Sequence, residues 1–283
     1  MFNIIKDKRA FWFTLPAIIL VAGVLAYPAI YTIMMSTHNF STIQLLVDTF
    51  TDTRVYSSLW KSVIFVGGTV ILHLVLGLIL ALIANYSPIA KNIFPFIVVV
   101  PWVLSDVVTS IMWRWMVNPN VGILNIVLKQ LGMSSQNWLS VPTTAFVILI
   151  IADTWKGVGL AFLFILSSLK KIPKALYDSA HVDGAGEFRI LINITLPIIT
   201  PTLLVLAIIF TIGTFNLINI IYILTGGGPF NATNVLALHM YKTAFFSLDF
   251  SKGASIAVVI FLVNIVFTLI YFRFLKRSQD IYR

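Results

Sequence analysis

Charged and amide side chains inside long apolar stretches are the residues of this sequence most suited to bind a polar solute. Asp106, Asp153 and Lys156 lie among runs of Ile, Val, Leu and Phe, and Asn216 and Asn219 follow another such run. Ionisable groups in apolar segments are costly, which makes each of them a candidate functional residue. Together they offer carboxylate, ammonium and amide groups that can hydrogen-bond a hydroxyl-rich molecule.

Other kinds of chemistry find little support in the residue types. The chain has no cysteine, which excludes disulfides, thiolate metal sites and cysteine nucleophiles. Its four histidines are scattered and have no partner at metal-ligand spacing. The run Gly226–Gly228 resembles a phosphate-binding loop only superficially, because no Gly-Lys-Ser or Gly-Lys-Thr occurs in the chain. We expect no catalytic site, no metal site and no cofactor in this chain.

The composition predicts that these residues are embedded in a membrane. Of 283 residues, 59% are hydrophobic and only 10% are charged, with a mean hydropathy of +0.98. Soluble domains carry about 25% charged residues, so this chain is too apolar to be covered by water. Its net charge of +9 lies in short basic clusters between apolar runs, which is typical of membrane topology and not of nucleic-acid binding.

Six apolar stretches are long enough to cross the roughly 30 Å hydrocarbon layer as helices. The sequence therefore predicts an all-α integral membrane protein with spans at about 11–35, 63–84, 93–117, 145–169, 203–224 and 255–275.

The Lys and Arg distribution predicts the orientation of these spans. With the N-terminus inside, the internal segments hold twelve of the 19 Lys and Arg residues and the external segments hold five. Because cytoplasmic loops carry the excess of basic residues, we expect both termini in the cytoplasm. Gly226–Gly228 then lies outside, where we expect a flexible turn that contacts a soluble partner.

The candidate binding residues fall at similar depths in this topology. At about 1.5 Å per residue, Asp106 lies roughly 16 Å from the outer end of its span and Asp153 roughly 12 Å from the outer end of the next. Asn216 and Asn219 lie roughly 8 to 12 Å inward. The aromatic rings expected beside them, and the glycines expected to leave room for a cargo, are Trp102, Trp155, Phe215, Gly157 and Gly159.

Structural roles remain open for several of these residues. Asp153 and Lys156 are three residues apart and can pair along one helix, which would only steady the bundle. The asparagines can bond between helices, and Asp106 can lie in a water-filled vestibule. His73 and Asn264 are expected to be packing contacts.

The polar segment 170–201 has its own local pattern. Pro173 can begin a helix, which we expect over Lys174–Val182. Gly184 can end that helix in a left-handed turn, and a second amphipathic helix should follow before Pro197 and Pro201 return the chain to the membrane. This predicts a helical projection on the cytoplasmic side, where small side chains allow another protein to approach closely.

This segment resembles the cytoplasmic loop motif of binding-protein-dependent ABC importer permeases, Glu-Ala-Ala, three residues, Gly and a later Leu-Pro. The matching residues are Asp178, Ser179 and Ala180, then Asp183, Gly184 and Ala185, then Leu196-Pro197. Asp178 and Ser179 replace the usual Glu and Ala. The segments Phe13–Ala17, Phe215-Asn216 and Leu224–Pro229 resemble those of sugar permeases, and Asp153–Gly157 resembles a substrate-lining stretch of the maltodextrin permease, which has neutral residues at positions 153 and 156.

The resemblance implies the partners and location of the chain. It implies one permease domain over residues 1–283 with a type I importer core, in the cytoplasmic membrane of a prokaryote. The expected partners are a second, homologous permease, two cytoplasmic ATPase subunits that bind ATP and Mg²⁺, and an external solute-binding protein. The loop residues 178–180 and 183–185 would contact the ATPase, and the cargo would be a sugar or oligosaccharide.

Three alternatives are compatible with parts of the sequence. A permease for another polar solute, such as a glycerol phosphate, would share the same fold. A secondary transporter would share the apolar spans, although we find no repeat between the two halves. A membrane phosphotransferase would share the Asp183-Gly184 pair, but the rest of its signature is absent.

Overall fold

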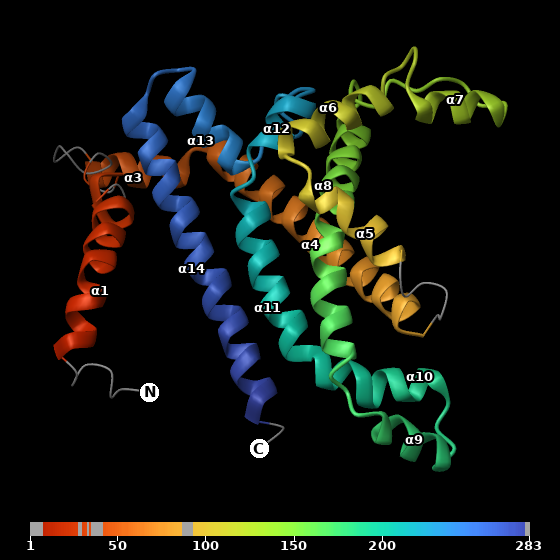
Figure 1. Cartoon of the computed structure of the whole chain (residues 1–283). Coiled ribbons are helices and arrows are strands. Elements are labelled where there is room, and N and C mark those ends of the chain that lie inside the picture. Colours follow the sequence, from red (N-terminus) through yellow and green to blue (C-terminus); the bar gives the residue numbers. More distant parts are fainter. Residues whose placement is uncertain (1–7, 28–29, 33, 35–41, 87–92, 281–283) are drawn as a thin grey trace. The chain divides into compact units, whose positions relative to one another are not determined.

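The computed structural model describes residues 8–27, 30–32, 34, 42–86 and 93–280, and within these ranges the chain forms helices and no strand (Figure 1). The basic residues Lys6, Lys91 and Arg283 of the charge count lie outside the described residues. The elements are α1 (Lys8–Val21), η2 (Ala22–Ala26), α3 (Thr42–Thr51), α4 (Thr53–Tyr86), α5 (Phe94–Val103), α6 (Asp106–Met116), α7 (Ile123–Gln130), α8 (Pro142–Leu169), α9 (Lys174–Val182), α10 (Glu187–Ile190), η4 (Leu191–Thr195), α11 (Leu196–Phe215), α12 (Asn219–Leu224), α13 (Leu236–Phe245) and α14 (Phe250–Asp280). The two η elements are π-helical.

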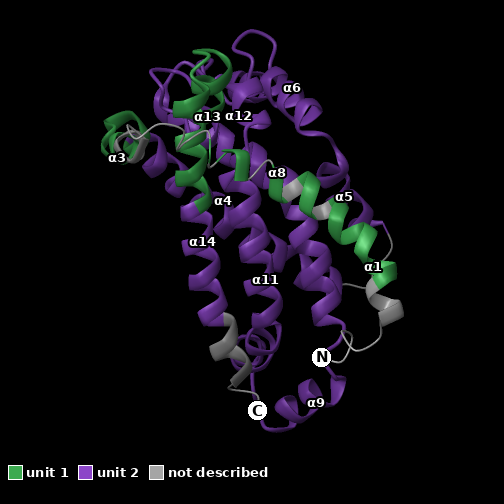
Figure 2. Ribbon diagram, turned by 90° about the vertical axis from the view of Figure 1, so that its left-hand side faces the viewer, with its two compact units in different colours: residues 1–56, 240–261 green, residues 57–239, 262–283 purple. Residues whose placement is uncertain are grey.

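The chain divides into two compact units (Figure 2). Unit 1 comprises residues 1–56 and 240–261, and unit 2 comprises residues 57–239 and 262–283. Unit 1 contains an ion pair between Lys252 Nζ and Asp52 Oδ2 at 2.8 Å. Unit 2 contains all the candidate site residues that the sequence predicts.

Four helices in the described residues are long and apolar enough to cross a membrane. They cover Thr53–Tyr86, Pro142–Leu169, Glu187–Phe215 and Phe250–Phe274 and correspond to four of the six predicted spans. The first predicted span, 11–35, corresponds to a shorter apolar helix at Trp12–Val24 and includes residues outside the described ranges.

The third predicted span is not one straight helix. The segment 93–117 forms α5 and α6, which are bent by 103° at the break between them. Leu104 and Ser105 adopt extended backbone angles, and the Ser105 hydroxyl caps α6 by accepting a hydrogen bond from the Val108 N–H at 3.3 Å. The expectation that Asp106 lies partway along a continuous helix is therefore wrong, because Asp106 is the first residue of α6.

The fifth predicted span, 203–224, is also interrupted. Helix α11 ends at Phe215, and α12 begins separately at Asn219. The helix that crosses instead starts earlier, at Glu187, and runs through α10, η4 and α11 without a break. Residues 187–202, expected to lie largely outside the membrane, thus continue directly into the span.

Helix α8 is the centre of unit 2, and its glycines and alanines allow neighbouring helices to approach closely. A Cβ atom on Gly77 of α4 would lie 2.6 Å from the Cβ of Ala161, and one on Gly159 would lie 2.8 Å from the Val98 carbonyl oxygen in α5. Small residues at such contacts are typical of packed membrane helices. Gly159 therefore accommodates α5, not a cargo as the sequence suggested.

Candidate functional site

Three helices bring Asp106, Lys156 and Asn219 together in unit 2, and we call these residues the Asp106 cluster. Lys156 Nζ of α8 lies 2.6 Å from Asp106 Oδ1 of α6. Asn219 Nδ2, at the start of α12, donates to Asp106 Oδ2 at 3.2 Å. The side chains of the ion pair are only 21% and 23% exposed. Both carboxylate oxygens of Asp106 are thus engaged by residues from other helices.

The two helix breaks are what make this cluster possible. Since α6 starts at Asp106 and α12 starts at Asn219, both residues occupy helix N-termini. A carboxylate in the first turn is stabilised by the N-terminal helix dipole. Helix α12 packs against both α6 and α8, which places Asn219 beside the ion pair.

Asp153 is not part of this cluster, and it does not pair with Lys156. Its side chain is buried, and its Oδ2 accepts a hydrogen bond from the Thr214 hydroxyl of α11 at 3.4 Å. The alternative of an Asp153–Lys156 ion pair is therefore wrong, because Lys156 extends to Asp106 instead. Asp153 joins α8 to α11 in the interior of unit 2.

His73 makes the helix contact that the sequence predicts for it. Its Nε2 lies 3.0 Å from the carbonyl oxygen of Asp153, and its ring lies 4.4 Å from that of Phe210. A Cβ atom on Gly157 would overlap the His73 ring. Gly157 thus makes room for His73, and the space that the sequence reserved for a cargo is filled by that ring.

Two tryptophans pack against each other on the helices that carry Asp106 and Lys156. The rings of Trp113 in α6 and Trp155 in α8 meet edge to face with centroids 6.2 Å apart. Trp113 Nε1 is buried and has no hydrogen-bond partner among the described residues. The sequence interpretation missed Trp113, although its position seven residues after Asp106 places both on one face of a helix.

The other predicted site residues have different surroundings. Phe215 is 1% exposed and packs against Phe267 with centroids 5.9 Å apart, so it belongs to the core. Asn216 is exposed, and its amide donates to the Ile212 carbonyl of its own helix at 2.7 Å. Trp102 is 41% exposed and lies against Gly159. The structure thus brings together Asp106, Lys156 and Asn219, whereas Trp155 packs against Trp113 and Phe215 packs in the core.

The Asp106 cluster can recognise a polar, uncharged molecule. The carboxylate accepts hydrogen bonds, and the ammonium and amide groups donate them. Among the described residues, no group of three or more His, Cys, Asp or Glu side chains is placed to hold a metal ion. The cluster itself therefore supports binding through hydrogen bonds.

A second polar region follows the C-terminal end of α8 and comprises α9 and α10 (Figure 1). Helix α9 covers Lys174–Val182, as the sequence predicts. Gly184 has a φ of +75°, and the N–H groups of Gly184 and Ala185 donate to the carbonyls of His181 and Ala180 at 3.0 and 2.9 Å. This pair of bonds is a Schellman motif, which ends a helix at a glycine.

Most of the loop residues face outward. Asp178, Ser179, Asp183 and Gly184 are exposed, and Ala185 is half-buried. Ala180 differs from the expectation of an open contact residue, because it is only 8% exposed and packs within the chain. In contrast, Val182 is 87% exposed and Phe188 is 75% exposed. These two apolar side chains are exposed on the loop, and the Asp-Gly motif gave no sign of them.

The segment Gly226–Phe230 is held by hydrogen bonds and is not the flexible turn that the sequence suggested. The Thr233 hydroxyl lies 2.7 Å from the Thr225 hydroxyl and donates to the Gly228 carbonyl at 2.7 Å. Lys61 Nζ donates to the Asn231 carbonyl at 2.9 Å. Phe230 is 90% exposed at the tip of this loop, with a φ of +50°. The loop presents an aromatic ring at the end of unit 2 opposite α9.

Residues 73–279 match the family described as binding-protein-dependent transport system inner membrane component. The match includes the α9–α10 loop and the Asp106 cluster. It covers well over half of the chain.

Characterised relatives match across most of their length. The chain is 36% identical to the trehalose/maltose transport system permease protein MalF of Thermococcus litoralis, over 75% of this chain and 72% of that protein. It is 31% identical to the sulfoquinovosyl glycerol transport system permease protein SmoG of Agrobacterium fabrum, over 94% and 89%. It is 32% identical to the sn-glycerol-3-phosphate transport system permease protein UgpA of Yersinia pestis, over 83% and 79%.

A solved structure has the same fold. A chain in the crystal structure of a bacterial alginate ABC transporter in complex with an alginate pentasaccharide-bound periplasmic protein superimposes with a TM-score of 0.84. The superposition covers 95% of this chain and 94% of that chain, at 24% sequence identity. At this identity the likeness establishes the architecture alone.

Proposed function

The chain belongs to the family of binding-protein-dependent transport system inner membrane components, and we propose that it is one permease subunit of an ATP-driven importer for a sugar or oligosaccharide. The cargo would arrive on an external solute-binding protein and leave into the cytoplasm. The family match and the relatives' names support the importer. The Asp106 cluster, with its hydrogen-bonding carboxylate, ammonium and amide groups, is the observation that supports the cargo class.

We propose six spans with both termini in the cytoplasm, in a prokaryotic inner membrane. Two features agree with this topology. The α9–α10 loop, which resembles the ATPase-binding loop of the family, lies on the side that the Lys and Arg count predicts to be cytoplasmic. The Gly226–Phe230 loop lies at the opposite end of unit 2, where an external binding protein would approach.

The charge of the Asp106 cluster favours an uncharged cargo over a phosphate ester. Lys156 is the cation nearest to the proposed site, and Asp106 neutralises it at 2.6 Å. The buried Asp153 adds a further acidic group nearby in α8. A phosphate-bearing solute such as a glycerol phosphate, the cargo named for the Yersinia relative, would meet no net positive charge here. A neutral sugar can form hydrogen bonds with these groups and needs no positive charge to compensate a charge of its own.

The proposed partners share the work of the importer. A second, homologous permease would complete the pathway, and two ATPase subunits would bind ATP and Mg²⁺ and dock on the α9–α10 loop. Asp178, Ser179, Asp183 and Gly184 would contact the ATPase directly. Ala180 and Ala185 would shape the loop from within.

Purification and reconstitution test this function. A tagged chain isolated from its own membrane should retain an ATPase subunit, and the reconstituted complex should take up sugar only with ATP and the binding protein. Uptake should be compared among neutral sugars, oligosaccharides and sn-glycerol 3-phosphate. Uptake driven by an ion gradient without ATP would instead indicate a secondary transporter, and preferential uptake of the phosphate ester would overturn the cargo assignment.

A further inference from the structure

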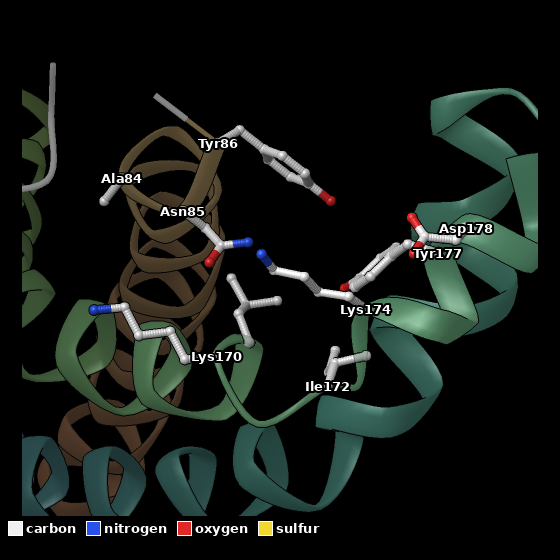
Figure 3. Close-up of a pocket in the computed structure, with 9 residues that line it drawn as sticks. Ala84, Asn85, Tyr86, Lys170, Ile172, Lys174, Tyr177 and Asp178 are labelled. Carbon is white, nitrogen blue, oxygen red and sulfur yellow. The ribbon is translucent and has the colours of Figure 1, made fainter. Parts of the chain in front are cut away.

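A pocket of about 490 Å³ opens between the ends of α4 and α8 and the start of α9 (Figure 3). Its walls are Ala84, Asn85 and Tyr86 from α4, Leu169 and Lys170 from the end of α8, Ile172, and Lys174, Tyr177 and Asp178 from α9. The pocket lies at the C-terminal end of α8, about 20 Å along the helix from Lys156 of the Asp106 cluster. Neither the proposed transport pathway nor the helix packing accounts for it.

The polar groups of this pocket suit a phosphate. Figure 3 shows the ammonium group of Lys174 and the hydroxyl of Tyr86 both directed into the space between α4 and α9. Lys170 extends from the end of α8 on the other side of Asn85. Among the described residues neither lysine has an acidic partner within ion-pair distance. The Lys174 ammonium therefore lies beside the Asn85 amide, and Lys170 lines the same pocket with its ammonium group directed away from that of Lys174.

The position of the pocket favours a lipid as the source of that phosphate. Helix α4 carries exposed apolar side chains up to the pocket, with Ile79 and Ile83 46% and 47% exposed. Tyr86 ends the helix at 56% exposure, which is typical of an aromatic residue at the level of the headgroups. A lipid whose acyl chains lie along α4 would thus bring its phosphate to Lys170 and Lys174.

We propose that this pocket binds the phosphodiester headgroup of an anionic phospholipid. Basic pockets between the cytoplasmic ends of membrane helices are suited to such headgroups. Asp178 at the α9 wall disfavours a compact free anion but can accept a hydrogen bond from a headgroup hydroxyl, as in phosphatidylglycerol. The lipid would then fix α9 relative to the ends of α4 and α8.

Native mass spectrometry of the intact transporter that contains this chain tests the proposal. The complex is released from nanodiscs of phosphatidylcholine with or without phosphatidylglycerol, and retained lipid is counted. The double variant Lys170→Gln with Lys174→Gln should retain about tenfold less phosphatidylglycerol, because it removes the charged groups that line the pocket and can form charge-assisted hydrogen bonds with the phosphate. Tyr86→Phe keeps both charges and should lower retention by a smaller factor.

Lys171→Gln is the matched control. Lys171 is exposed and adjacent to Lys170 in the same basic run, but it does not line the pocket. It should retain phosphatidylglycerol to within about twofold of the unmodified chain, since its loss changes only the diffuse surface charge. If Lys171→Gln and the double variant lost equal amounts of phosphatidylglycerol, the lipid would be held by general electrostatic attraction to the basic run. That result would overturn the proposed binding pocket.

Two other occupants have distinct outcomes, and each would overturn the proposal. Free anion binding would show as saturable binding of radiolabelled inorganic phosphate that the double variant abolishes, with phosphatidylglycerol retention unchanged. Occupation by the ATPase subunit would show as loss of that subunit from the double variant, again with unchanged lipid retention. The lipid count is made without ATP or substrate, so its result is separate from the test of transport.

Discussion

The middle of α8 and its C-terminal end carry two polar regions that are held together in different ways. The α9–α10 loop is shaped by backbone hydrogen bonds between residues at most five positions apart, such as Ala180 and Ala185. In the Asp106 cluster, the two side-chain bonds join residues 50 and 113 positions apart. The loop can therefore move as a preformed body, whereas the cluster exists only while three helices keep their relative positions.

This difference suits the two roles that we propose. A loop that docks on an ATPase must transmit a displacement without deforming. A cargo site must instead change its affinity when the helices around it move, and a cluster contributed by α6, α8 and α12 does so as soon as one of them shifts. The following variants are designed to break either kind of connection.

Gly184→Pro should have the largest effect. Proline fixes φ near −65°, whereas Gly184 has a φ of +75° and donates its N–H to the His181 carbonyl. We expect ATP-driven uptake to fall well over tenfold or the ATPase to dissociate, measured by transport and co-purification. Gly186→Ala is the control, because Gly186 has a φ of −75° and open space around it. Full uptake by Gly184→Pro with normal assembly would refute the coupling role.

Lys156→Met should have the next largest effect. It leaves the partly buried Asp106 carboxylate without its cation, a loss that can amount to several kcal/mol. We expect uptake to fall about tenfold, which corresponds to about 1.4 kcal/mol, with little change in basal ATPase activity.

The double variant Asp106→Asn with Lys156→Met distinguishes a role of the ion pair in sugar binding from a role in helix packing. It removes both charges, so the helices should assemble normally while sugar uptake remains low. If the double variant transports as well as the unmodified complex, the pair only holds the helices together and the cargo site lies elsewhere.

Asn219→Ala should reduce uptake several-fold, and more than Asn216→Ala. Loss of an ordinary hydrogen bond costs about 0.5 to 1.5 kcal/mol, and the exposed Asn219 makes one such bond to Asp106 at 3.2 Å. Asn216 bonds only to the Ile212 carbonyl of its own helix in the described structure. Initial uptake rates at several sugar concentrations measure the difference. The reverse order of effects would place the cargo beside Asn216.

Glu187→Gln should have the smallest effect. Glu187 Oε1 lies 3.7 Å from His181 Nε2, and both side chains are at least half exposed. Exposed pairs of this kind contribute little, so uptake should stay within about twofold of the unmodified chain. A large loss would mean that Glu187 itself contacts the ATPase, and it would shift the docking surface toward α10.

The sequence predicted the loop in detail because the signals for it are local. Pro173 marks the start of α9, and the Asp183-Gly184 pair marks its end, so the predicted bounds Lys174–Val182 are confirmed. The left-handed conformation at Gly184 follows from the lack of a side chain. The long apolar helices α4, α8 and α14 could also be predicted from the sequence, because a long run of apolar residues is enough to indicate a membrane-spanning helix.

The Asp106 cluster was harder to predict because its geometry depends on breaks inside apolar runs. The run 93–117 as a whole is long and apolar enough for one span, and hydropathy therefore predicted one straight helix over it. A Ser followed directly by an Asp is nevertheless a helix-start signal, and it marks the first residues of α6. The pairing of Lys156 with Asp106 instead of Asp153 follows from the position of α6, which no local pattern encodes.

The π-helical turn η4 determines in which direction around the axis of helix α11 the α9–α10 loop projects. A π turn accommodates one extra residue, and each residue of an α-helix corresponds to about 100° of rotation and 1.5 Å of rise. Deleting one residue within Leu191–Thr195 would relax this turn to α geometry and swing α10, with α9 attached, by about a quarter of a revolution. The side of the helix on which α9 projects is therefore determined by a single inserted residue, and not by the composition of the loop.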